Sequence, residues 1–127
     1  LCQLSLDKQS SQITYSAAGS GVMLHVSSGG IRELGAGESG PELGVMDYGE
    51  FENQCCITHK GDFLILLTEN AMHAIEGGSR EAKIQKVQRT IGKGSRLSAA
   101  DMIKRLRKLT LNLIEDDASI IVVKRTI

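Results

Sequence analysis

Two groups of acidic side chains stand at the ends of two strongly apolar runs. Glu69 follows the run at 63–67, and the pair Asp116 and Asp117 precedes the run at 119–123. Continuous apolar runs of about five residues are typical of buried strands. A carboxylate at the end of such a strand lies at the rim of the core, where ligands and water reach it. We therefore expect the two acidic groups to share one site.

The cysteines do not predict a second kind of site. Cys2, Cys55 and Cys56 contain no C-x-x-C pair, which argues against zinc. Adjacent residues on a strand point to opposite faces, so Cys55 and Cys56 are not expected to act together. We interpret all three as small buried hydrophobic residues, and their pattern favours a reducing, cytoplasmic environment.

The histidines are also interpreted without a catalytic role. His73 lies four residues after Glu69 and would share its side of a helical turn, within reach of a metal ion held there. A lone surface histidine is the plainer interpretation, and His25 and His59 are expected to face solvent. Because no histidine is placed beside a cysteine, the sequence does not support a cysteine nucleophile.

A glycine-rich segment imitates a nucleotide-binding motif. Residues 35–40 read G-A-G-E-S-G, which fits the spacing G-x-G-x-x-G. That motif binds a pyrophosphate only when a helix begins directly behind it. Here Pro41 follows, and the carboxylate of Glu38 would repel phosphate. We therefore expect no nucleotide site.

The elements that must position the acidic groups are strands followed by helices. Alternating or continuous apolar residues predict strands at 1–6, 13–17, 22–26, 31–34, 51–58, 63–67 and 118–124. Helical spacing predicts a short helix starting at 72–75, a second at 80–91, and a third opened by Ser98, with Asp101 completing a capping box. The order predicts an α+β fold with antiparallel β-sheet layers flanked by helices.

Composition describes an ordinary globular chain with an uneven charge. The 127 residues suffice for one domain, and no apolar run approaches the length of a membrane span. Aromatic residues make up 3%, so platforms that stack nucleic-acid bases are not expected. Residues 1–78 hold three basic and ten acidic side chains, and residues 79–127 hold twelve and five. This asymmetry marks either a partner-binding face or, more plainly, a solvated helix face.

Five segments, in order, resemble the SpoIIE/RsbU/RsbX-type phosphatases, which belong to the metal-dependent type 2C (PPM) serine/threonine phosphatase superfamily. Residues 13–20, ITYSAAGS, resemble the family's LTYxNAGH, and LGVMD at 43–47 resembles PLGxxxD. GDFLILLTEN at 61–70 resembles GDxLLLYTDG, and LSAAD at 97–101 resembles the start of the last helix. EDDASIIVV at 115–123 resembles DDxTxxVV. The resemblance implies a partial αββα sandwich of the PPM-phosphatase type.

The resemblance also implies a metal site that this chain holds in altered form. Family members use two Mn²⁺ or Mg²⁺ ions to activate water for attack on a phosphoserine phosphorus. It implies Asp116 as a retained ligand with Asp117 beside it, and Glu69 as a ligand in place of the family's aspartate. Asn70 replaces the glycine that follows, and it is one of the few residues that tolerate a positive φ there. Ala17 and Ser20 replace the asparagine and histidine of NAGH.

Three functions follow from these observations. The first is a fragment, residues 1–127, of a phosphatase domain whose N-terminal portion is absent; its substrate would be a bacterial signalling protein of the stress response, such as a STAS-type anti-anti-sigma factor. The second is a degenerate phosphatase-like module that binds a regulatory partner protein without catalysis. The third is an α+β domain whose acidic residues only cap a strand. Nucleic acid and membrane are not expected as partners, and a homodimer is left open.

Overall fold

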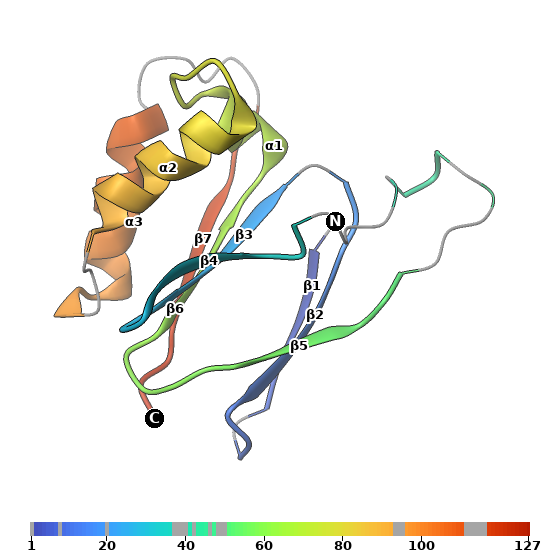
Figure 1. The fold of residues 1–127 in the computed structure, drawn as a ribbon, viewed down its shortest axis with the longest axis vertical. Helices are drawn as coiled ribbons and strands as arrows, with labels where there is room; N and C mark the ends of the chain where they lie inside the picture. The colour runs from blue at the N-terminus through green and yellow to red at the C-terminus, as the bar shows by residue number, and fades with distance from the viewer. Residues whose placement is uncertain are drawn as a thin grey trace.

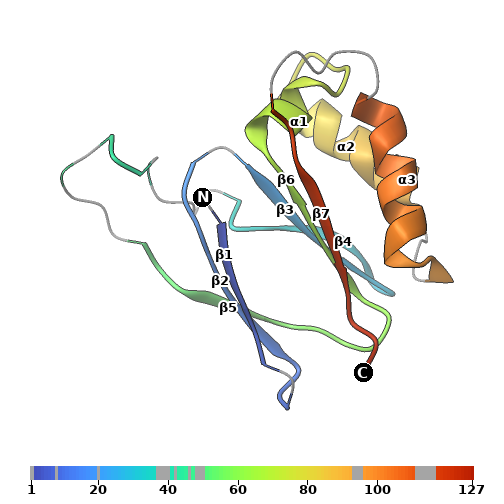
Figure 2. The ribbon, with the colours of Figure 1, turned by 180° about the vertical axis from the view of Figure 1, so that it is seen from behind.

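Two antiparallel sheets are stacked, and three helices cover the outer face of one of them (Figures 1 and 2). The computed structural model describes residues 2–7, 9–19, 21–36, 41, 43–45, 47, 51–92, 96–110 and 117–127. The first sheet has the order β1 (Cys2–Leu6), β2 (Gln12–Ala17), β5 (Gln54–Ile57). The second has the order β4 (Gly30–Leu34), β3 (Val22–Ser27), β6 (Phe63–Leu67), β7 (Ile120–Lys124).

The two central strands of the second sheet are buried on both faces. Every residue of β3 from position 22 to 26 is buried, and so are four of the five residues of β6. Alternation along β3 sends Val22, Leu24 and Val26 toward the helices and Met23 toward the other sheet. Continuous burial explains why β6 is an unbroken apolar run and why β3 is apolar from position 22 to 26 except at His25.

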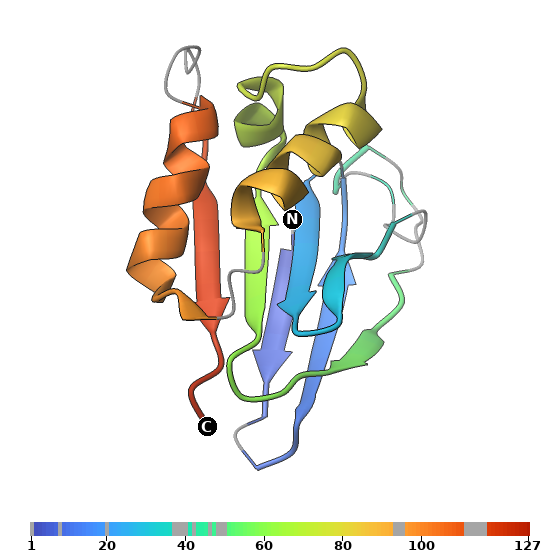
Figure 3. The ribbon, with the colours of Figure 1, turned by 60° about the vertical axis from the view of Figure 1, so that its left-hand side comes forward.

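The helices pack their apolar sides on this sheet. They are α1 (Glu69–His73), α2 (Arg80–Ile91) and α3 (Ala99–Thr110). Val87 and Ile91 of α2 and Met102 of α3 are fully buried against β3 and β6. Figure 3 shows α3 lying along β7, with its C-terminal end at the end of the molecule where β7 begins and α1 lies.

Local capping sets where α2 and α3 begin. Ser79 precedes α2, and its Oγ accepts a hydrogen bond from the main-chain N–H of Ala82 at 3.2 Å. Ser98 precedes α3, and its Oγ accepts from the N–H of Asp101 at 3.1 Å and donates to Asp101 Oδ2 at 2.7 Å. The predicted start of the third helix is confirmed, with an aspartate in place of the usual glutamate.

A second apolar layer joins the sheets. Ile13 and Tyr15 of β2 and Cys56 of β5 face Met23 and Leu64 of the second sheet. This is the arrangement that antiparallel layers flanked by helices predict, and the fold class is confirmed. Among the described residues, no helix has the length and apolar character to cross a bilayer.

Several element bounds differ from the predictions. The strand predicted at 51–58 is confined to Gln54–Ile57, and the last strand begins at Ile120. The first helix begins at Glu69, three residues earlier than predicted, because Thr68 caps it. Cys55 and Cys56 lie on opposite faces as predicted, but Cys2 and Cys55 are exposed, so only Cys56 is a buried hydrophobic residue.

Candidate functional site

An open groove of about 820 Å³ lies between the two sheets, at the end of the molecule where β6 finishes and β7 begins. Its walls come from the ends of β2, β3, β4, β6 and β7 and from the start of α2. The polar and charged residues that line it are Glu33, Thr68, Glu69, Arg80, Glu81 and Ser119. Three of these are carboxylates, so the groove suits a cation better than a free anion.

Thr68 joins the two strand ends that carry the acidic groups. Its Oγ1 accepts a hydrogen bond from the N–H of Ser119 at 2.9 Å, and its own N–H donates to the Ser119 carbonyl at 3.1 Å. The same Oγ1 caps α1 by accepting from the N–H of Ala71 at 3.4 Å. The pairing of Leu67 with Ile120 continues through these contacts. The predicted meeting of the two segments is therefore confirmed.

Asn70 fastens the segment before β7 to α1. Its Nδ2 donates to the main-chain carbonyl of Asp117 at 2.9 Å. Asn70 lies inside α1, and no described residue other than glycine has a positive φ. The expectation that this position needs a left-handed backbone is wrong, because Thr68 is the residue that turns the chain into the helix. Sequence reasoning missed the amide contact, since the partner is a main-chain atom 47 positions away.

Glu69 stands in the first turn of α1 at the groove wall. Its Oε1 lies 3.7 Å from Nε2 of His73, and both side chains are well exposed. The predicted spacing of this pair on one helical side is confirmed, and His73 is a surface residue. Asp117 is exposed beside the same strand ends. Asp116 lies outside the described residues.

The groove offers the kind of ligand that a hard divalent ion takes, but too few of them among the described residues. Carboxylate oxygens are the ligands that Mg²⁺ and Mn²⁺ take. Within the described ranges, however, no three His, Cys, Asp or Glu side chains are grouped closely enough to hold a metal. Glu69 and Asp117 do not fit a metal ion by themselves, and further ligands would have to come from Asp116 and from other segments.

Arg80 and Glu33 close one side of the groove. Arg80 Nη2 lies 2.8 Å from Glu33 Oε1 and donates to the Gly21 carbonyl at 3.3 Å, which ties the start of α2 to β4 and to the start of β3. Cys2 also lines the groove, and partial burial raises the pKa of its thiol. A raised pKa favours the neutral thiol, which is a weaker nucleophile than the thiolate.

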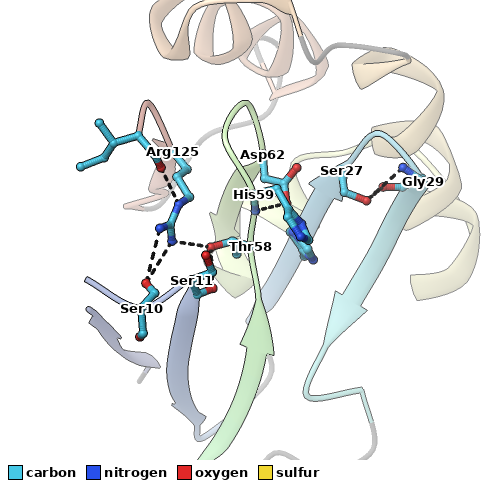
Figure 4. Close-up of polar contacts among 11 residues, drawn as sticks. Ser10, Ser11, Ser27, Gly29, Thr58, His59, Asp62 and Arg125 are labelled. Atoms are coloured by element: carbon cyan, nitrogen blue, oxygen red, sulfur yellow. Dashed lines mark hydrogen bonds and ion pairs between the residues drawn. The ribbon is translucent and has the colours of Figure 1, made fainter. Parts of the chain in front are cut away.

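A second polar cluster lies at the opposite end of the sheets (Figure 4). His25 is buried, and its Nε2 donates to Asp62 Oδ2 at 2.9 Å. The expectation that His25 faces solvent is wrong, because its face of β3 is covered by the first sheet. The side chain of His59 is exposed as expected. Nothing in the sequence pattern marks Asp62, which lies in a turn, as the partner of His25.

A comparison with protein-family models identifies the family of the chain. Residues 1–126 match the model described as Stage II sporulation protein E (SpoIIE). The chain belongs to the SpoIIE family. No curated protein sequence matches the chain.

Solved structures share the fold of this SpoIIE-family chain. The phosphatase domain of the cell fate determinant SpoIIE from Bacillus subtilis superposes with a TM-score of 0.71 at 16% identity, covering 99% of this chain and 56% of that one. The RsbU and RsbW domains of a Mycobacterium tuberculosis protein give a TM-score of 0.71 at 23% identity, covering 98% and 35%. The S. agalactiae serine/threonine phosphatase gives 0.57 at 13%, covering 91% and 55%. The chain thus has the PP2C phosphatase fold and spans about half the length of the SpoIIE phosphatase domain.

The groove gathers the segments that resemble the family. Ala17 and Gly19 come from the NAGH-like segment, Leu43 from the PLG-like loop, and Glu69 and Ser119 from the two strand ends. Positions 97–101 do not line it. Ser20 and most of the loop at 37–50 lie outside the described residues, as does Asp116. The extent of the domain and the metal ligands, Glu69, Asp116 and Asp117, stay predictions.

Proposed function

We propose that this chain is part of a metal-dependent phosphoserine protein phosphatase of the SpoIIE type, acting in a longer protein. The substrate class would be a phosphorylated signalling protein, such as a STAS-type anti-anti-sigma factor, in the cytoplasm of a bacterium. The supporting observation is the convergence of the family-like segments on one groove between the sheets.

In this proposal the acidic strand ends contribute part of a site for Mn²⁺ or Mg²⁺. Glu69, Asp116 and Asp117 would hold the ion together with ligands from outside the described residues. The ion, when bound, would supply an activated water and neutralise charge on the phosphoryl group. The chain's own part is to fix the carboxylates, and Thr68 and Asn70 do so by joining α1 to the segment before β7.

The test is hydrolysis of p-nitrophenyl phosphate by the full-length parent protein in the presence of Mn²⁺. We expect activity that needs the ion, and a loss of at least about tenfold for Asp116→Ala and for Glu69→Ala, since even an outer partner of a metal ligand costs that much. Glu76→Ala is the matched control. Glu76 is an exposed glutamate that pairs with Lys86 at 3.1 Å and does not line the groove.

Two results would count against the proposal. Activity that survives Asp116→Ala unchanged removes the metal role of the acidic pair. If the parent protein is folded by circular dichroism but shows no Mn²⁺-dependent hydrolysis, the proposed phosphatase activity is refuted.

One observation favours a second function, that of a phosphatase-like module that binds a partner without catalysis. The side chain at the position of the family's glycine, Asn70, is engaged in a structural contact with the Asp117 carbonyl. Calorimetric titration with Mn²⁺ separates the two. Binding that Glu69→Ala abolishes supports the enzyme, and the absence of binding supports the module.

A further inference from the structure

The outer side of α3 carries an unusual set of cations. Lys104, Arg105, Arg107 and Lys108 are all exposed, and they lie opposite the side of the helix that is buried in the core through Met102 and its neighbours. Within the described ranges, none of the four side chains makes a hydrogen bond or a close ion pair. We call these four residues the α3 basic face.

Three of the four basic residues of the neighbouring helix α2 show a different pattern. Arg80 pairs with Glu33 at 2.8 Å, and Lys86 pairs with Glu76 at 3.1 Å. Lys83 donates to the carbonyl of Met72 at 3.1 Å. These three cations contact other segments of the chain, whereas the side chains of the α3 basic face make no such contact among the described residues.

The acidic residue on α3 neutralises the basic face only in part. Asp101 is hydrogen-bonded by Ser98, and that bond, helped by the charges of Lys104 and Arg105, lowers the pKa of Asp101. The carboxylate therefore stays ionised but is engaged at the start of the helix. The α3 basic face carries four positive charges, and Asp101 is the single acidic residue of the helix. The outer side of α3 therefore has a net positive charge.

The chemistry of α3 selects among anionic partners. A helix that binds a membrane needs a free apolar side to enter the lipid, and the apolar side of α3 is buried in the core. Single-stranded nucleic acid is held by stacking on aromatic side chains, and α3 carries none. A protein surface rich in carboxylates needs only exposed cations, and arginine binds carboxylates in a two-pronged geometry.

We propose that the α3 basic face docks an acidic segment of the phosphorylated protein whose phosphoserine enters the groove. The C-terminal end of α3 lies at the same end of the molecule as the start of β7, which lines the groove (Figure 3). Among the described strands β7 is the outermost of its sheet, so the groove and α3 lie on the two sides of this strand. A small phosphate ester cannot span both. This inference rests on the proposed function, because it identifies the partner as the substrate.

The experiment compares two labelled phosphoserine peptides of equal length, one with flanking aspartates and glutamates and one with asparagines and glutamines. Their binding to the full-length parent is measured by fluorescence anisotropy. We expect the acidic peptide to bind the double variant Lys104→Glu, Lys108→Glu about fivefold or more weakly than the wild type, since each exposed ion pair adds a modest increment. The neutral peptide should bind the double variant and the wild type equally. The difference in affinity for the acidic peptide should disappear at about 0.5 M salt, because salt screens the charges.

The control is Arg32→Glu, Lys60→Glu, which changes net charge equally at two exposed residues of β4 and the β5–β6 turn. The double variant Lys104→Gln, Lys108→Gln should also bind the acidic peptide more weakly than the wild type. That result shows that the lost positive charge, and not a change in helix stability, causes the weaker binding. Equal binding of both peptides by the wild type overturns the inference, as does equal weakening by the control. Binding of anionic vesicles or of RNA that depends on Lys104 and Lys108, without a peptide preference, also overturns it.

Hydrolysis of p-nitrophenyl phosphate separates this inference from the function on which it rests. The small ester does not reach α3, so the double variant keeps wild-type turnover. Absence of turnover in the wild type refutes the enzyme, whereas a peptide preference that survives the double variant refutes only the docking surface.

Discussion

At the scale of single residues, Asp62 joins segments at the end of the sandwich opposite the groove. Its Oδ2 accepts hydrogen bonds from His25 Nε2 and from the main-chain N–H of His59, both at 2.9 Å, inside a region that solvent barely reaches. A carboxylate with two donors is well satisfied there, and removing it leaves both donors buried or half-buried without a partner.

We expect Asp62→Ala to lower the free energy of unfolding by about 2–4 kcal/mol, from roughly 1–3 kcal/mol for each orphaned donor with partial relaxation. Urea denaturation followed by circular dichroism measures this. His59→Ala is the control, since the His59 side chain is exposed and its loss should cost less than about 0.5 kcal/mol. An unchanged midpoint for Asp62→Ala would show that water replaces the carboxylate.

Sequence reasoning identified residue types better than residue partners. The pattern places His25 on the opposite face of β3 from Val22 and Leu24, which is right, but it cannot show that the first sheet covers that face. Asn70 was interpreted through backbone freedom, whereas the structure uses its amide. Both errors concern contacts between segments far apart in the chain, and the periodicity of one segment contains no information about them.

At the scale of elements, the start of α1 depends on Thr68. The hydroxyl caps the helix and also accepts from the N–H of Ser119, so one side chain connects α1, β6 and the segment before β7. Loss of such a cap usually costs about 1 kcal/mol, and the contact with Ser119 adds to it.

We predict that Thr68→Val, which keeps the shape but removes the hydroxyl, lowers stability by about 1–2 kcal/mol. Hydrogen exchange at the amides of Ala71 and Ser119 should accelerate, while the amides of β3 keep their protection. Thr68→Ser retains the hydroxyl and serves as the control. Acceleration spread evenly over the molecule would contradict a local role for the cap.

The elements themselves were largely predictable. Apolar alternation identifies β3, continuous apolar runs identify β6 and β7, and helical spacing identifies α2 and α3, with Ser98 marking the start of α3, because these signals are local. The bounds failed at two places. The predicted strand at 51–58 includes residues 51–53, although only Gln54–Ile57 pair with β2. The predicted start of α1 at 72 is three residues too late, because Thr68 caps the helix and its first turn begins at Glu69.

At the scale of the whole molecule, Arg125 ties the two sheets together. It follows β7, and its guanidinium donates to the Ser10 carbonyl in the β1–β2 turn and to Thr58 Oγ1 at 3.0 Å (Figure 4). Its main chain exchanges hydrogen bonds with the turn at Gly61 and Asp62. The sheets are thus joined by polar contacts at this end, while the groove separates them at the other.

We expect Arg125→Met, which keeps much of the side-chain volume, to lower the free energy of unfolding by about 1.5–3 kcal/mol, the usual value of hydrogen bonds to a charged group. Thermal unfolding measures the effect. Arg89→Met, at an exposed position of α2, is the control and should change little. Equal midpoints for the two variants would mean that apolar packing alone joins the sheets.

The layered fold and the groove were predictable to different degrees. The order of strands and helices, together with the family resemblance, predicts stacked antiparallel sheets, and that is confirmed. The sequence predicts only some of the residues that line the groove. Glu69 and Asp117 are brought to the same end by the pairing of β6 with β7, but Glu33 and Arg80 enter from β4 and α2, which no motif connects to them.

The strand order also matters to anyone who produces these residues as a recombinant fragment. β1 and β7 each end a sheet, and both carry exposed apolar side chains, Leu6 and Ile121. A free strand edge of this kind is a template on which another copy can add its own strand. Self-association of the fragment will therefore increase with concentration, and a lysine in place of Ile121, which also lines the groove, is the substitution that would guard the β7 edge.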